Sequence, residues 1–151
     1  MKRALRPAAV CLCAALIAAA LSLPLIARLA DDRAASRLAR SLASLPLPPQ
    51  TEVREVRAFA GKLVGSGNGV QLLGAVLLQS ELSEAALRDW YTAHAPDGIR
   101  AAVAPQDGAR IALVDHGEAV FDCSPIGGGY FLLYAWGSAA SPLSELDLRG
   151  H

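Results

Sequence analysis

An uncharged apolar run near the N-terminus constrains this chain more than any other feature of its sequence. Between Arg6 and Arg28 lie 21 residues, Pro7 to Ala27, which carry no charge and are mostly alanine and leucine. As an α-helix the run would be roughly 31 Å long, which matches a bilayer hydrocarbon core of about 30 Å. The run therefore predicts one transmembrane helix over residues 7–27. Pro24 falls within its last turns, where a kink is tolerated.

A cleaved signal peptide is the competing interpretation of the same run. The apolar region of a signal peptide is usually about 7–15 residues long and ends at an Ala-x-Ala-like site. Residues 18–20, all alanine, would provide such a site. Cleavage there would leave the apolar segment 21–26 exposed at the start of the mature chain. We therefore favour an uncleaved anchor.

Charged residues are distributed unevenly about position 45. Residues 1–45 carry seven Lys or Arg and two Asp or Glu, whereas residues 46–151 carry seven and twelve. Because phosphate binding requires clustered cations, the acidic domain argues against nucleic acid as its partner. Three basic residues precede the apolar run and four follow it, so the positive-inside count is nearly balanced. A short cationic N-terminus normally stays inside, so we expect residues 1–6 in the cytoplasm and the domain outside it.

Residues 28–50 are predicted to form a basic amphipathic helix and a proline-rich linker. Two interpretations of the helix stay open. In the first it binds a surface: it lies on an anionic membrane, with its arginines at the lipid headgroups, or pairs with a partner helix. In the second it is a solvated stalk that continues the transmembrane helix. The proline cluster at 46–49 would end the helix in either case. The basic face consists of Arg33, Arg37 and Arg40, and the apolar face of Leu38, Leu42 and Leu45.

Residues 51–137 are predicted to form one small α+β domain, with a loose tail over residues 138–151. The glycine-rich segment 65–69 is typical of a hairpin turn, because glycine and asparagine accept positive φ at little cost. The segment 70–79 is almost continuously apolar, which indicates a strand buried on both faces. The expected order is ββαββββ, a mainly antiparallel sheet with one packed helix. The predicted strands span 52–64, 70–79, 99–104, 110–115, 118–123 and 129–136, the last being central.

The helix of this domain has clear start signals in the sequence. Ser83 suits the N-cap position, with Glu84 in the first turn, and residues 96–98 (Pro-Asp-Gly) would end the helix. Its predicted inward face consists of Leu87, Trp90, Tyr91 and His94, at i, i+3, i+4 and i+7.

Three segments carry a resemblance to a known group of proteins. They are the hairpin 61–69 (GKLVGSGNG), the helix start 82–87 (LSEAAL) and the aromatic strand 130–137 (YFLLYAWG). Together they resemble small bacterial membrane-anchored proteins of unknown function, over about residues 46–138. The resemblance implies a domain boundary and an anchor, and it implies no activity.

The domain contains the residue types of a thiol-based active site. Cys123 would be the nucleophile, His94 or His116 the base, and Asp115 or Asp122 the group that orients it. One cysteine and two histidines arise in a domain of this size without any function, however. We therefore expect Cys123 to be a small buried hydrophobe and His94 a core residue of the helix.

Other patterns that suggest ligands are equally weak. The histidines and carboxylates lack metal-ligand spacing, and the loop 65–69 lacks the Lys-Ser/Thr ending and the following helix of a phosphate-binding loop. Tyr130, Tyr134 and Trp136 alternate on one face of the last strand and could form a ligand platform, but packing beneath the Trp90 helix is the better interpretation. We expect no cofactor and no metal.

These patterns favour a non-enzymatic, membrane-tethered interaction module whose partners are the lipid bilayer and an envelope protein. A pilin-type structural subunit is the alternative, because an apolar helix continues past a proline into an amphipathic stretch before a sheet domain. The chain lacks a Gly-then-aliphatic processing site and an early acidic residue, which counts against that alternative. A tethered hydrolase that uses Cys123 is the third class.

Overall fold

The computed structural model describes residues 5–96, 98–139 and 142–150. It contains one long N-terminal helix, a four-stranded antiparallel sheet of order β1-β2-β4-β3, and a second α-helix, which confirms the predicted α+β class. The elements in chain order are α1 (Leu5–Ala43), β1 (Thr51–Gly61), β2 (Gln71–Ser80), α2 (Glu84–His94), β3 (Ala102–Pro105), β4 (Tyr130–Ser138) and the short 3₁₀ helices η1 (Ser144–Leu146) and η2 (Leu148–Gly150).

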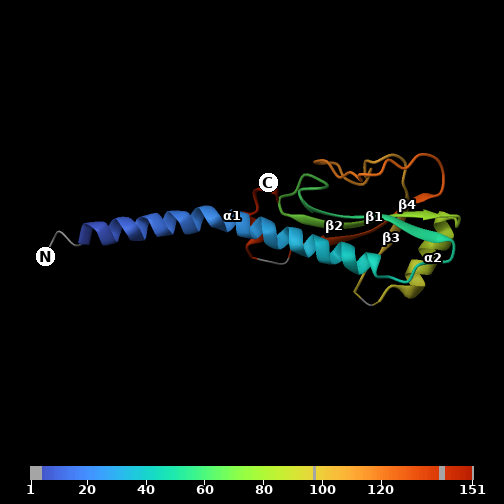
Figure 1. The fold of residues 1–151 in the computed structure, drawn as a ribbon, viewed down its shortest axis with the longest axis horizontal. Helices are drawn as coiled ribbons and strands as arrows, with labels where there is room; N and C mark the ends of the chain where they lie inside the picture. The colour runs from blue at the N-terminus through green and yellow to red at the C-terminus, as the bar shows by residue number, and fades with distance from the viewer. Residues whose placement is uncertain (1–4, 97, 140–141, 151) are drawn as a thin grey trace.

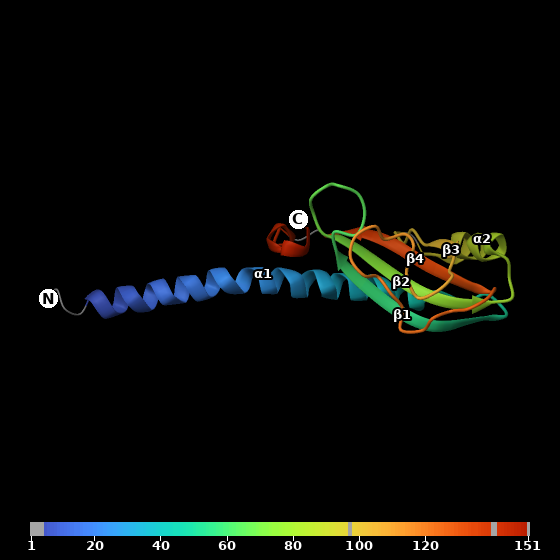
Figure 2. The same cartoon turned by 90° about the horizontal axis from the view of Figure 1, so that it is seen from above.

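Helix α1 is continuous over 39 residues, roughly 58 Å, and its two halves have different surroundings. The N-terminal half protrudes from the domain (Figures 1 and 2), and its large apolar side chains are exposed, Leu21 to 75%. The C-terminal half packs on the sheet and buries Ala35, Ala39 and Leu42. Residues 28–43 are therefore a structural element of the domain, and they are not the free stalk that was one of our two interpretations.

A glycine in β2 allows this close packing. Gly74 lies beneath α1, and a Cβ built on it would be 2.8 Å from the backbone nitrogen of Ala39 and 3.0 Å from its Cα. Small side chains on the facing surface of α1, Ala35 and Ala39, complete the contact. The helix therefore lies almost directly on the strand backbone.

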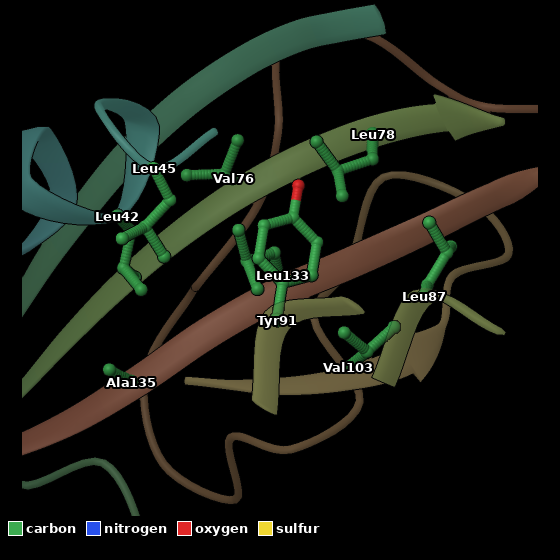
Figure 3. Close-up of a cluster of buried hydrophobic side chains, with 9 residues drawn as sticks. All are labelled: Leu42, Leu45, Val76, Leu78, Leu87, Tyr91, Val103, Leu133 and Ala135. Carbon is green, nitrogen blue, oxygen red and sulfur yellow. The ribbon is translucent and has the colours of Figure 1, made fainter. Parts of the chain in front are cut away.

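The sheet is buried on both faces. Both α-helices cover one face, where Leu42 and Leu45 meet Leu87 and Tyr91 over β2 and β4 (Figure 3). The loop layer, residues 106–129, covers the opposite face (the orange segment in Figure 1). Every residue from Leu72 to Leu78 is buried, which confirms the prediction that this strand has no solvent-facing side.

The C-terminal part of the sheet differs from the predicted order. Strand β4 is central, as predicted, and β3 is a four-residue edge strand. The segments 110–115 and 118–123 are not strands: within the loop layer they form one isolated bridge, Arg110 to Val120. Their apolar residues, including Ile111 and Phe121, pack down onto the sheet, and this burial produced the strand-like alternation.

The tail that we predicted to be loose is packed. Residue 138 belongs to β4, and residues 142–150 lie against α1 and the loop between β1 and β2. Backbone bonds join Lys62 N to Arg149 O and Gly69 N to Gly150 O, each at 2.7 Å. The tail therefore lies at the end of the domain nearest the protruding half of α1 (Figures 1 and 2).

Candidate functional site

The residues of the predicted thiol site are not brought together. His94 is on α2, which covers one face of the sheet, whereas Cys123 closely follows Phe121, which packs on the opposite face. The Cys123 amide donates to Glu55 in β1, while His116 bonds the Gly65 carbonyl beyond the far end of that strand. The end of β1, Gly61, lies six positions beyond Glu55, which corresponds to roughly 20 Å.

The Cys123 thiol is also poorly suited to catalysis. The side chain is exposed, so our expectation of a buried cysteine was wrong. Hydrogen bonding to the Glu55 carboxylate raises the pKa of Cys123 above its ordinary value. Since the thiolate is the nucleophile, this neighbour lowers the reactivity of the thiol. Among the described residues no group of three His, Cys, Asp or Glu is arranged to hold a metal ion.

Helix α2 begins as predicted, but only part of its expected inner face is buried. The Ser83 hydroxyl accepts from Ala86 N at 3.3 Å, and Leu87 and Tyr91 are buried. Trp90 is only partly buried: its ring nitrogen donates to Pro46 O at 3.0 Å, and its ring stacks on His94 with centroids 4.0 Å apart. His94 is exposed and is not the core histidine that we expected.

The glycine-rich loop connects β1 and β2, as predicted, and its geometry is internally satisfied. Gly65 and Gly69 adopt positive φ. The Gln71 side-chain oxygen accepts from the backbone nitrogens of Leu63 and Val64, and its amide group donates to Val64 O. A hollow of about 360 Å³ lies beside the loop, and none of the side chains that line it is cationic. The side chains around this hollow therefore lack the cationic charge of a phosphate site.

The aromatic side chains of β4 do not form an open platform. Tyr130 and Tyr134 pack against the cluster beneath the loop layer, and Trp136 remains 38% exposed. We had placed this face beneath the Trp90 helix, which is wrong: Phe131 and Leu133 face the helices instead. Core packing was the correct interpretation, on the opposite side of the sheet.

The arginine face of α1 is exposed, with Arg33, Arg37 and Arg40 all solvent-accessible. The leucines that we expected to insert into a membrane surface are instead part of the domain: Leu42 and Leu45 are in its core, and Leu38 packs against it. The helix therefore lacks a free apolar face in this region. Contact between the three arginines and lipid headgroups stays a prediction.

A polar cluster that the sequence did not reveal joins the tail to α1 just beyond the uncharged run. We call it the tail clasp. The buried Ser144 hydroxyl donates to the buried Asp31 carboxylate at 2.8 Å. The Arg149 guanidinium donates to Asp147 and to Asp32, each at a shortest distance of 2.7 Å, and to the Arg28 carbonyl at 3.3 Å. The acidic pair at 31–32 within an otherwise basic helix was the only signal of this cluster in the sequence.

The pKa values of the two buried carboxyl groups of the tail clasp, Asp31 and Asp147, are shifted in opposite directions. Burial raises the pKa of Asp31, aided by the negative charge of Asp147, despite the hydrogen bond from Ser144. Burial also opposes ionisation of Asp147, but hydrogen bonds from Arg149 outweigh it and lower the pKa of Asp147. The second Asp31 oxygen, Oδ2, is buried without a hydrogen-bond partner among the described residues. The cluster therefore combines the ion pair of Arg149 and Asp147 with a carboxyl group, Asp31, whose ionised form is disfavoured by burial.

Comparisons of the chain with protein-family models, with curated proteins and with solved structures found no match.

Proposed function

We propose that this protein is a single-pass membrane protein whose extracytoplasmic domain is a non-enzymatic interaction module. The observation that supports this most is the protruding half of α1. Its most apolar 18-residue window has a mean hydropathy of 2.5, and none of that window is buried within the protein. Exposed apolar surface of this extent is unfavourable in water by about 25 cal/mol per Å², whereas a bilayer removes that cost.

The shared helix argues for a role that depends on position. Because α1 passes without interruption from the apolar half into the core, the domain has no flexible linker to its anchor. Residues 27–43 would extend roughly 24 Å beyond the bilayer core. A module fixed at this height presents the same surfaces to every neighbour in the membrane, which suits an accessory protein of an envelope assembly. The dispersed histidines and cysteine support a non-enzymatic role.

The anchor and the orientation can be tested on the full-length chain. An alkaline carbonate wash of native membranes is expected to leave the protein in the pellet, because the hydrophobic effect holds the span. Recovery of a soluble form that starts near Leu21 would show cleavage instead.

The exposed Cys123 then reports on orientation. With Cys11→Ser and Cys13→Ser as background, an impermeant maleimide at mildly alkaline pH is expected to label intact cells from which any outer barrier has been removed. Labelling only after lysis would place the domain in the cytoplasm. Crosslinking in native membranes then tests for a protein partner, and recovery of this chain alone would count against the module.

A pilin-type subunit is a second candidate, favoured by one observation: half of α1 protrudes and half packs on an antiparallel sheet. The absence of the processing site and of the early acidic residue still counts against it. Filaments that contain this chain, seen by immunolabelling, would support the second candidate over the first.

A further inference from the structure

The tail clasp places the last residues of the chain at a defined level along α1. Arg149 bonds the carbonyl of Arg28, the first charged residue after the uncharged run, and the side chain of Asp32, one turn later. Both ribbon views show the tail as the part of the domain nearest the protruding half of α1 (Figures 1 and 2). If the run 7–27 spans a bilayer, the tail lies at the membrane interface.

The tail carries exposed apolar side chains at this level. Leu148, directly before the arginine of the clasp, is 75% exposed, and Leu146 is 38% exposed. On α1 itself, Leu29 continues the exposed apolar surface beyond the end of the uncharged run. In the same nine-residue segment the polar residues Ser144 and Asp147 are buried, whereas these two leucines are not. The leucines therefore point to a surface outside the protein.

We propose that residues 142–150 form a membrane foot, which rests the domain on the bilayer interface through Leu146 and Leu148. The occupant of this surface is lipid, because the bonds from Arg149 to Arg28 and Asp32 hold the foot at the end of the span, at the depth where acyl chains meet headgroups. This inference rests on the proposed membrane anchor. With α1 it gives the domain two contacts with the bilayer, so the domain cannot tilt freely about the end of the span.

The foot is held by directional contacts on two sides. Ser144 and Arg149 bind α1, and the Arg149 and Gly150 carbonyls accept from the loop between β1 and β2. Gly150 also fits closely: a Cβ on it would be 3.0 Å from the Val70 nitrogen. The foot therefore moves together with the domain, so the depth of the foot in the membrane indicates the height of the domain above it.

The test uses full-length protein in vesicles of phosphatidylcholine and phosphatidylglycerol. In a background of Cys11→Ser, Cys13→Ser and Cys123→Ser, a fluorophore is attached at Leu148→Cys. The matched control is Ile126→Cys, because Ile126 is 86% exposed and lies near Gly129, which bonds Ser80 at the opposite end of the sheet. A third label at Leu16→Cys reports on the span.

The label at position 148 is expected to be quenched several-fold more than that at 126 by nitroxide lipids, and to be shielded from aqueous iodide. Equal iodide access at 148 and 126, with the label at 16 still quenched by lipid, would overturn the foot and leave the anchor standing. If the label at 148 is shielded from iodide but is not quenched by nitroxide lipids, a protein neighbour and not lipid covers this position, which would also overturn the foot. Loss of quenching at 16 would overturn the anchor and the foot together.

Discussion

Replacing Gly74 by alanine tests whether α1 is a structural part of the domain. The added methyl carbon would lie 2.8 Å from the Ala39 nitrogen, 3.0 Å from its Cα and 3.1 Å from the Leu38 carbonyl carbon. All three are backbone atoms of a helix, so no side-chain rotation relieves the clash. The helix would have to retreat by about 0.6 Å to reach ordinary contact.

The magnitude follows from two opposing effects. Overpacking of this kind costs about 1–3 kcal/mol. Alanine restricts the unfolded chain more than glycine does, which raises the free energy of unfolding by about 0.4–1 kcal/mol. The free energy of unfolding is therefore expected to fall by about 1–2 kcal/mol, and the melting temperature of the domain by roughly 5–10 °C.

Gly137 in β4 provides the matched control. A Cβ there would meet Leu38 Cδ2 at 3.5 Å and Leu72 Cβ at 3.6 Å, which is ordinary contact with side chains. The Gly137→Ala variant is therefore expected to be as stable as the parent or slightly more stable. Thermal unfolding of both full-length variants in the same detergent, followed by circular dichroism, makes the comparison. Equal melting temperatures would refute the close packing of α1 on β2.

Three further perturbations follow from buried groups. Leu42→Ala is expected to lower the free energy of unfolding by about 2–5 kcal/mol in chemical denaturation, although residue 42 lies outside the predicted domain; a loss below about 1 kcal/mol would contradict its place in the core. Tyr91→Phe is expected to be neutral or stabilising, because the buried Tyr91 hydroxyl lacks a hydrogen-bond partner among the described residues (Figure 3), and burial raises its pKa to about 12; clear destabilisation would reveal a missed partner. Folding raises the pKa of Asp31, so its ionisation makes the folded protein less stable as the pH rises above the ordinary aspartate pKa of about 3.9. Asp31→Asn is therefore expected to melt higher than the parent near neutral pH and to lose this advantage in acid, and an advantage that does not change with pH would contradict the assignment.

The sequence predicted those elements whose signals are local. The N-cap at Ser83, the turn around Gly65–Gly69 and the two-sided burial of β2 each follow from a few neighbouring residues, and each is confirmed. The exposed apolar half of α1 has the length and composition of a membrane span.

The failures have one physical cause: they depend on contacts between distant segments. Leucines at helical spacing show that one face of a helix is apolar, but they do not show whether lipid or a sheet covers it. Leu42 and Leu45 are covered by β2 and β4, which come later in the sequence. A truncated chain that starts at residue 51, where the predicted domain begins, would lack this part of the core.

The same limit applies to the candidate site. The apolar alternation in 110–123 arises from packing on a sheet, which a strand and a loop satisfy equally. The tail clasp depends on residues whose separation in sequence exceeds one hundred positions, such as Asp31 and Ser144. Short polar segments such as 144–149 are typical of disordered ends, so the sequence favoured a loose tail.

The tail clasp also has a consequence for the order of events during biosynthesis. Asp31 leaves the ribosome long before Ser144, its partner 113 positions later in the chain. Contacts of such separation are slow to form, because a long loop must close before they stabilise anything. Until β1, β2 and β4 have been made, the buried face of α1 also has no sheet to cover it. We therefore expect the domain to reach its final stability only after the tail has been made, and its unfinished form to be a natural substrate for chaperones and proteases.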